Sequence, residues 1–249
     1  MERLVNKSQL RAFVGKVNAF TPCQEKRHYK RLSFLVHAIH RMTCERFPYA
    51  ESDVLESILL SARHHEGERR KTKDKPPYII HPLEAAYTLL RLGVSSPEAL
   101  MIAILHDTRE NSKHGSRATA KDIREKLKND TVSRGVELCT KPKGHDLGAT
   151  LENHITSHHW QSLLAKIAER CHNLETLHVL PEETQKRKLA EVEKYFWRMC
   201  NVAEAEICTQ VRKHHLPKRY LRIIPKLREQ LKLRVTQCNA RRMRSRAAA

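Results

Sequence analysis

Apolar residues recur along most of this chain at spacings of three and four, which is the period of an amphipathic helix. No segment shows the strict alternation of apolar and polar residues that marks a half-buried strand. One helical segment has apolar positions at Leu32, Phe34, Leu35, Ala38, Ile39 and Met42. With only 7 glycines and 5% aromatic residues in 249, the pattern predicts an all-α protein.

One predicted helix is apolar on every side. Ser96 is a good capping residue, and Pro97 followed by Glu98 suits the first helical turn. The residues after them, ALMIAIL, contain no polar side chain. This composition predicts a buried central helix that carries His106 and Asp107 at its C-terminal end.

Further helices are expected at 54–65, 131–139, 159–180 and 182–212, after two helices within the first 50 residues. Pro76 and Pro77 impose an extended approach to His81, and the segment 141–150 is expected to be a loop. Near the C-terminus, 225–235 suggests a short basic helix and 239–249 a disordered end. We divide the chain into an N-terminal helical extension (1–50), a central helical domain (51–205) and a basic C-terminal helical tail (206–249).

The net charge of +19 is concentrated near the C-terminus. From Arg212 onward there are 13 Lys and Arg but a single acid, Glu229, so this segment carries +12 of the total. A strongly basic tail suits nucleic acid, the ribosome or an acidic surface, and the moderately basic remainder suits a small polyanionic substrate.

The cysteines and the hydropathy indicate a cytoplasmic protein. The seven cysteines form no CxxC pair, so reduced thiols are the simplest interpretation. The N-terminus lacks the apolar core of a signal peptide, and no apolar run approaches the roughly 18 residues of a membrane span.

Candidate metal ligands are widely spaced. YIIHP supplies His81, ILHD supplies His106 and Asp107, and KIAER supplies Glu169. Two imidazoles and two carboxylates can meet at one divalent ion only if helices bring them together, and such a donor set leaves room for a bound water. The alternative interpretations, which involve no metal ion, are polar residues with hydrogen-bond partners at a helix end and, for Glu169, a surface salt bridge.

Other histidines receive a simpler interpretation. His37 and His40 share a helix face three residues apart, but surface or partly buried histidines are favoured over a metal site there. His145 and Asp146 repeat the His-Asp dipeptide without an apolar helix before it, so they are expected to be loop residues.

The order His, His-Asp, acid resembles that of the HD phosphohydrolase superfamily. The flanking segments HHEGERRKTKDKPPYIIHPLEAAYTLL, ALMIAILHDTREN, CTKPKG and LLAKIAERCHNLETLHVL resemble the hydrolase domain of the RelA/SpoT family over roughly Val54 to Asn201. The resemblance implies an HD-domain helical bundle. It also implies a guanosine-3′,5′-bis(diphosphate) 3′-diphosphatase that degrades the alarmones ppGpp and pppGpp in the stringent response, with Mn²⁺ as the usual metal.

The same resemblance implies roles for individual residues. Arg70 would stack on the base, Lys71 and Thr72 would add polar contacts, and Lys166, Asn173 and Thr176 would hold the nucleotide from one helix face. Glu110, with Asn111 beside it, would orient and deprotonate the attacking water. The chain departs from the family pattern at three of its positions: Asn111 and Glu169 stand where the family has Asp, and Glu175 stands where Arg is frequent.

Three functions therefore remain open. The first is an alarmone hydrolase without synthetase activity, which is expected because the chain ends too soon after the hydrolase-like region to contain the family's synthetase domain and the tail does not resemble one. The second is an HD phosphohydrolase acting on another 3′-phosphorylated nucleotide or on NADPH. The third is a degenerate HD protein that binds nucleotide or RNA, as Asn111 and the basic tail suggest. RNA or ribosome contact through the tail is compatible with the first function too, whereas a membrane partner is not expected.

Overall fold

The computed structural model describes residues 6–72, 74–108, 120–141 and 144–247. Within these ranges every regular element is helical, and the extended backbone is limited to one isolated bridge between Arg69 and Pro77. The prediction of an all-α protein is confirmed. The helices are α1 (Lys7–Phe20), α2 (Lys26–Arg46), α3 (Glu51–His64), α4 (Ile80–Leu92), α5 (Pro97–Leu105), α6 (Ala120–Leu127), α7 (Asp130–Cys139), α8 (Leu147–Thr156), α9 (Trp160–Glu175), α10 (Glu182–Glu191), α11 (Trp197–Arg212) and α12 (Ile223–Ala247).

The central helix is α5, as the sequence predicts. Every residue from Ala99 to Leu105 is at most 2% exposed. The Ser96 hydroxyl accepts a hydrogen bond from the backbone N–H of Ala99, and Pro97 occupies the first turn. Because α3, α4, α7 and α9 all pack against α5, its C-terminal end is fixed from several sides, and that end carries the candidate ligands.

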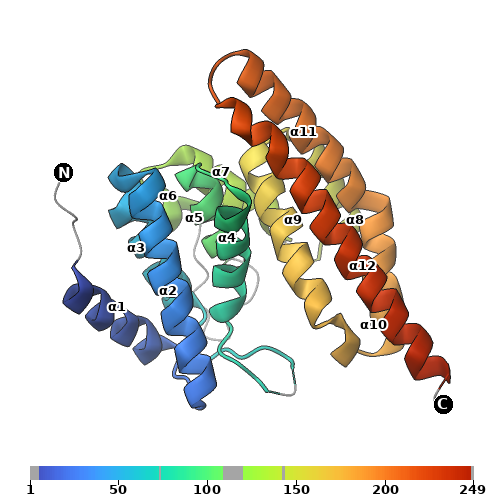
Figure 1. Ribbon diagram of the computed structural model, residues 1–249, viewed down its shortest axis with the longest axis horizontal. Helices are drawn as coiled ribbons and strands as arrows, with labels where there is room; N and C mark the ends of the chain where they lie inside the picture. The colour runs from blue at the N-terminus through green and yellow to red at the C-terminus, as the bar shows by residue number, and fades with distance from the viewer. Residues whose placement is uncertain (1–5, 73, 109–119, 142–143, 248–249) are drawn as a thin grey trace.

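The N-terminal helices α1 and α2 contribute to the same core. Val17 and Leu35 are fully buried and belong to one continuous hydrophobic cluster with the residues of α5. Helix α2 packs against α4, and α1 packs against α3 (Figure 1). The division of the chain at residues 50 and 205 remains an interpretation of the sequence, since the core is continuous across both positions.

The C-terminal tail differs from the expectation. Residues 239–247, expected to be disordered, continue α12, which lies alongside α9 and α11 (Figure 1). Leu227 and Leu231 are fully buried and Cys238 is 3% exposed. The prediction was wrong because it considered only the charge of this segment. In the fold Arg241 donates to the Glu175 carbonyl oxygen and Arg242 pairs with Glu182.

Two other segments need correction. The helix expected at 159–180 ends at Glu175 and is followed by a short 3-10 turn, Leu177–Val179. The helix expected at 182–212 contains a π-helical segment, Val192–Phe196, between α10 and α11. The expected loop 141–150 contains the start of α8, whose N-cap is Asp146, so the His-Asp dipeptide there caps a helix.

Candidate metal and nucleotide site

Helices α4 and α5 bring three of the predicted ligands together. His81 is the second residue of α4, and His106 and Asp107 directly follow α5, where the helix ends and neighbouring side chains can turn to one point. One donor atom from each residue lies within 4.8 Å of the other two. His106 Nε2 is 3.1 Å from Asp107 Oδ2, and His81 Nε2 is 3.6 Å from the same oxygen.

The donor set fits a divalent metal ion. Both Nε2 atoms are buried and lack a well-aligned hydrogen-bond partner among the described residues. The opposite nitrogen of His106, Nδ1, is 2.8 Å from the Ala103 carbonyl oxygen and donates to it, so Nε2 is the nitrogen that can ligate a metal ion. Buried polar atoms without partners are costly, and a cation between the two imidazoles and the carboxylate would satisfy all three.

The electrostatic environment favours a neutral His81 and an ionised Asp107. Burial, together with the charges of Arg70 and His172, holds the pKa of His81 well below its usual range, so its imidazole is neutral. Burial also lowers the pKa of His106, but the adjacent Asp107 carboxylate outweighs burial and raises it. Burial opposes ionisation of Asp107, yet the charge and the hydrogen bond of His106 keep its pKa well below normal, so a carboxylate is present.

Glu169 lies beside this group but has other partners in the structure. It is 7% exposed, accepts a hydrogen bond from Asn173 at 2.5 Å, and forms an ion pair with Lys166 at 2.9 Å. Its donor atoms are outside the group of three that lies within 4.8 Å. Burial opposes its ionisation, but Lys166 and His106 together lower its pKa, so a buried anion faces the metal position without touching the other ligands.

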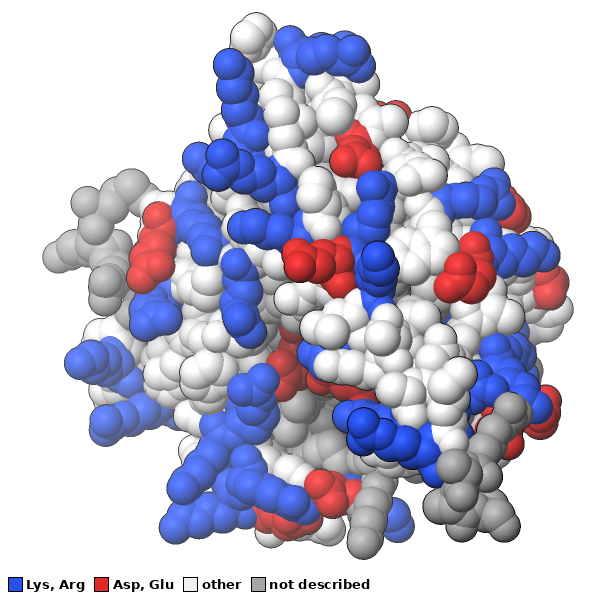
Figure 2. All heavy atoms as spheres, turned by 45° about the vertical axis from the view of Figure 1, so that its right-hand side comes forward, with Lys and Arg blue, Asp and Glu red and all other residues white. Residues whose placement is uncertain are grey.

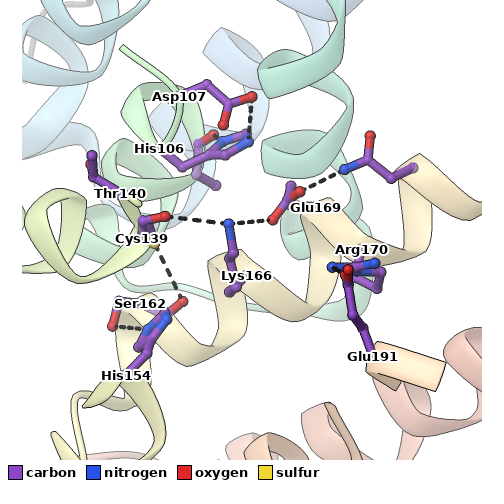
Figure 3. A network of polar contacts seen from close by, with 12 residues as sticks. His106, Asp107, Cys139, Thr140, His154, Ser162, Lys166, Glu169, Arg170 and Glu191 are labelled. Carbon is purple, nitrogen blue, oxygen red and sulfur yellow. Dashed lines mark hydrogen bonds and ion pairs between the residues drawn. The ribbon is translucent and has the colours of Figure 1, made fainter. Parts of the chain in front are cut away.

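Lys166 links this carboxylate to the neighbouring helix. Its ammonium group also donates to the Cys139 carbonyl oxygen at 3.3 Å, so it lies between α9 and the end of α7 (Figure 3). Lys166 and Glu169 line a cavity of about 470 Å³ together with Asp107. Basic residues of this cavity are Lys141, Lys166, Arg170, Arg187 and Lys188.

A second cavity of about 310 Å³ opens on the other side of Glu169. It is lined by Arg70, Lys71, Thr72, Asn173 and Thr176, five of the six residues predicted to contact substrate. Its apolar part comes from Leu174, Leu177, Val179 and Leu180. The Arg70 guanidinium donates to the Asn173 side-chain oxygen at 2.9 Å and lies 5.6 Å from the centre of the Tyr78 ring. The basic loop and α9 therefore form one pocket.

Two further residues, not predicted from the sequence, touch the ligands. The Tyr78 hydroxyl donates to Asp107 Oδ2 at 2.7 Å. His172 Nδ1 lies 2.6 Å from His81 Nδ1, with the rings stacked. Their spacing from the predicted ligands could have indicated both residues. Tyr78 is three residues before His81, and His172 is three residues after Glu169 on the same helix face.

Three further residues were singled out in the sequence: Glu110, Asn111 and Glu175. Glu110 and Asn111 lie outside the described residues. Glu175, at the position where the family frequently has Arg, forms an ion pair with Arg234 of α12 at 2.5 Å. Glu175 therefore joins α9 to the tail helix.

Surface charge agrees with an anionic ligand. Lys and Arg side chains spread over the face shown in Figure 2, with Asp and Glu between them. No helix in the described ranges is long and apolar enough to cross a membrane.

Comparisons with known proteins point to one group. The chain is 30% identical over 155 residues to the GTP pyrophosphokinase of Streptomyces antibioticus, which covers 58% of this chain and 18% of that protein. It is 31% identical over 147 residues to the guanosine-3′,5′-bis(diphosphate) 3′-pyrophosphohydrolase of Aquifex aeolicus, covering 57% and 20%. It is 32% identical over 162 residues to the bifunctional (p)ppGpp synthase/hydrolase RelA of Mycobacterium tuberculosis, covering 62% and 20%.

The chain thus matches about a fifth of the length of these curated relatives. No family model matches it. Among solved structures, it resembles a metazoan ortholog of SpoT that hydrolyses ppGpp, with a TM-score of 0.53, 19% identity, and coverage of 74% of this chain and 96% of that one. By sequence the chain is a relative of the RelA/SpoT proteins, and it has the all-α fold of the metazoan SpoT ortholog.

Proposed function

We propose that this protein is a cytoplasmic, metal-dependent hydrolase of (p)ppGpp that removes the 3′-diphosphate and does not synthesise the alarmone. The observation that carries the proposal is the position of Glu169. It lines both cavities, and beside it the donor atoms of His81, His106 and Asp107 converge. A nucleotide in one cavity would place its 3′-diphosphate next to these ligands.

The pocket chemistry suits a guanine nucleotide. A guanidinium plane such as that of Arg70 can stack on a purine, and Tyr78 behind it supports the plane. Lys71 and Thr72 on the same loop, with Asn173 and Thr176 on α9, offer polar contacts to the sugar and phosphates. Lys166 lies on the diphosphate side, where its charge would offset the negative charge that develops during hydrolysis.

The divalent ion would be held by His81, His106 and Asp107, with Glu169 as a fourth ligand once it exchanges Lys166 for the ion. When bound, the ion supplies Lewis acidity and a lower pKa for a coordinated water. Mn²⁺ is proposed because the resemblance to the RelA/SpoT hydrolase domain implies it. His172 would keep the proton of His81 on Nδ1, which leaves Nε2 free to ligate.

Glu110 is proposed as the general base and Asn111 as its neighbour that holds the water by hydrogen bonds. Water would attack the phosphorus atom bonded to the ribose 3′ oxygen. The bond between them breaks, the 3′ oxygen takes a proton, and GDP or GTP and pyrophosphate are released.

The test is incubation of the purified chain with ppGpp and Mn²⁺, following GDP and pyrophosphate. We expect turnover that disappears in His106→Ala and increases in Asn111→Asp. Absence of turnover in the wild-type protein with metal bound would contradict the proposal. A parallel reaction with ATP and labelled GDP should yield no ppGpp, and its formation would refute the hydrolase-only part.

A second candidate keeps the metal chemistry and changes the substrate to another 3′-phosphorylated nucleotide or to NADPH. Glu175 favours it, because it stands on α9 where the family frequently has Arg, so that basic contact to the substrate is missing from α9. A panel of ppGpp, pppGpp, a 3′-phosphorylated adenosine nucleotide and NADPH separates the two, since one substrate should have a clearly higher kcat/KM.

RNA or ribosome binding by the tail, without catalysis, is the third candidate. Several tail arginines already have partners in the body, because Arg228 pairs with Glu204, Arg234 with Glu175 and Arg242 with Glu182. Exposed cations such as Arg222, Lys226 and Lys232 could still contact phosphates. Charge reversal at these three positions should abolish RNA binding if the tail is responsible, and binding that is unchanged and insensitive to salt would exclude it.

A further inference from the structure

A second cluster of metal-ligating side chains lies where α2 meets α3. His40 and Cys44 are four residues apart on α2, so they share one helix face. Glu51 is the first residue of α3, and the short turn Pro48–Ala50 brings it back against the last turns of α2. None of these residues contributes to the hydrolase site described above.

The donor atoms of this cluster are close together and largely buried. His40 Nε2 is 2.7 Å from Glu51 Oε1 and 3.5 Å from Cys44 Sγ. All three donor atoms lie within 4.8 Å of one another. His40 is 8% exposed and Glu51 3%, while Cys44 is partly exposed.

A single nitrogen atom faces both a carboxylate and a sulfur atom. When Nε2 carries a proton it donates it to Glu51, and the same nitrogen lies 3.5 Å from Cys44 Sγ. If Nε2 is deprotonated, a buried carboxylate loses its donor. A metal ion at the position of that proton would bond to the nitrogen, the oxygen and the thiolate at once.

The distances suit a tetrahedral ion after a small adjustment. From usual zinc bond lengths, tetrahedral geometry requires ~3.6 Å between nitrogen and sulfur and ~3.4 Å between nitrogen and oxygen. The first separation is already 3.5 Å. The second is 2.7 Å and would have to widen by ~0.7 Å, which a rotation of the Glu51 side chain can provide.

We propose that His40, Cys44 and Glu51 bind a thiophilic divalent ion of the Zn²⁺ class, with water as the fourth ligand. One His nitrogen, one thiolate and one carboxylate are a donor set that zinc accepts. The ion would tie the end of α2 to the start of α3, so its effect would be on stability. The competing interpretation is a buried His–Glu hydrogen bond with a thiol beside it.

The test uses Co²⁺ as a spectroscopic probe of the full chain under reducing conditions. Cobalt bound to a thiolate gives an intense sulfur-to-metal charge-transfer band, whereas the site of His81, His106 and Asp107 has no sulfur ligand. We expect one equivalent of the band in the wild-type protein, its loss in Cys44→Ser, and its persistence in Cys23→Ser and in His106→Ala. A band that survives in Cys44→Ser, or no band at all, would overturn the proposal.

Thermal unfolding with Zn²⁺ in the His106→Ala background gives a second measurement. Added Zn²⁺ should raise Tm, because a ligand that binds only the folded state stabilises it. The rise should vanish when Cys44→Ser or Glu51→Gln is added. Cys44→Ser is nearly isosteric and partly exposed, so the variant is expected to fold. An equal rise in Tm with and without Cys44 would show that zinc binds elsewhere.

Discussion

His172 Nδ1 lies 2.6 Å from His81 Nδ1, and the two rings are stacked with centroids 4.9 Å apart. At this distance one nitrogen must donate and the other must accept, so a single proton lies between the two Nδ1 atoms. Burial, followed by the charge of Arg70, lowers the pKa of His172 to about 3, which keeps His172 neutral and able to accept. His81 is thereby held with Nε2 toward the metal position.

The first prediction concerns this pair. His172→Phe keeps a ring but removes the acceptor, so metal affinity should fall by about 10- to 100-fold, the usual cost of losing a partner of a ligating histidine. His172→Gln, which retains an acceptor, should lose less. Isothermal titration with Mn²⁺ measures both, with His37→Asn on α2 as the control. Unchanged affinity in His172→Phe would mean that His81 is oriented by other contacts.

The second prediction concerns Tyr78, which donates to the buried Asp107 carboxylate at 2.7 Å. Tyr78→Phe removes this donor, and hydrogen bonds to charged groups contribute about 1.5–3 kcal/mol. The free energy of unfolding of the metal-free protein should decrease by that order, measured by urea denaturation in chelator. Tyr49→Phe is the control, since Tyr49 is 73% exposed. Equal stability of the two variants would contradict the role given to Tyr78.

The third prediction concerns substrate binding by Arg70, and it depends on the proposed function. Arg70→Ala should raise KM roughly tenfold with little change in kcat, because a contact to the base acts equally in the ground and transition states. Arg70→Lys should also be impaired, since an ammonium group cannot stack as a plane. Steady-state kinetics with ppGpp tests both against Arg41→Ala on the exposed side of α2. A loss confined to kcat would place Arg70 at the reacting phosphate instead.

The fourth prediction concerns the tail helix. Leu231 is fully buried, and Leu231→Ala should cost about 2–5 kcal/mol. Arg234→Ala should cost less than about 1 kcal/mol, because the Arg234–Glu175 pair is partly exposed and solvent screens it. Urea denaturation measures both. If deleting residues 223–249 left the stability unchanged, the tail would not belong to the core.

The fifth prediction concerns pH and the buried His154, whose Nε2 is 2.7 Å from the Ser162 hydroxyl. Burial, followed by the charge of Lys166, lowers its pKa from 6.5 to about 3. Above pH 6.5 neither the folded nor the unfolded state is protonated there. Below pH 6.5 His154 binds a proton in the unfolded state but not in the folded state. The free energy of unfolding should therefore fall by up to about 1.4 kcal/mol per pH unit until about pH 3.

This prediction is checked by urea denaturation between pH 7 and pH 4. His154→Gln should show a flatter decline than the wild-type protein, although the buried His172 leaves part of the slope in place. Parallel curves for the two proteins would indicate that His154 is protonated in the folded state.

The sequence by itself determined the helical class and the central helix. The period of apolar residues, the Ser96 cap and the uniformly apolar run after Pro97 are local signals, and local signals decide which backbone hydrogen bonds form. The same holds for the end of α5, where His106 and Asp107 were expected and are found. The segments that resemble the RelA/SpoT family also named five of the residues that line the smaller cavity.

Tertiary structure decided what these residues touch. The contact of His172 with His81 and the docking of α12 through Glu175 and Arg234 join positions that are far apart in the sequence, so periodicity does not reveal these partners. The arginine-rich end of the chain looked disordered because only the fold brings Glu175 and Glu182 to Arg241 and Arg242. Convergence of distant side chains depends on how helices pack, and packing is a property of the whole core.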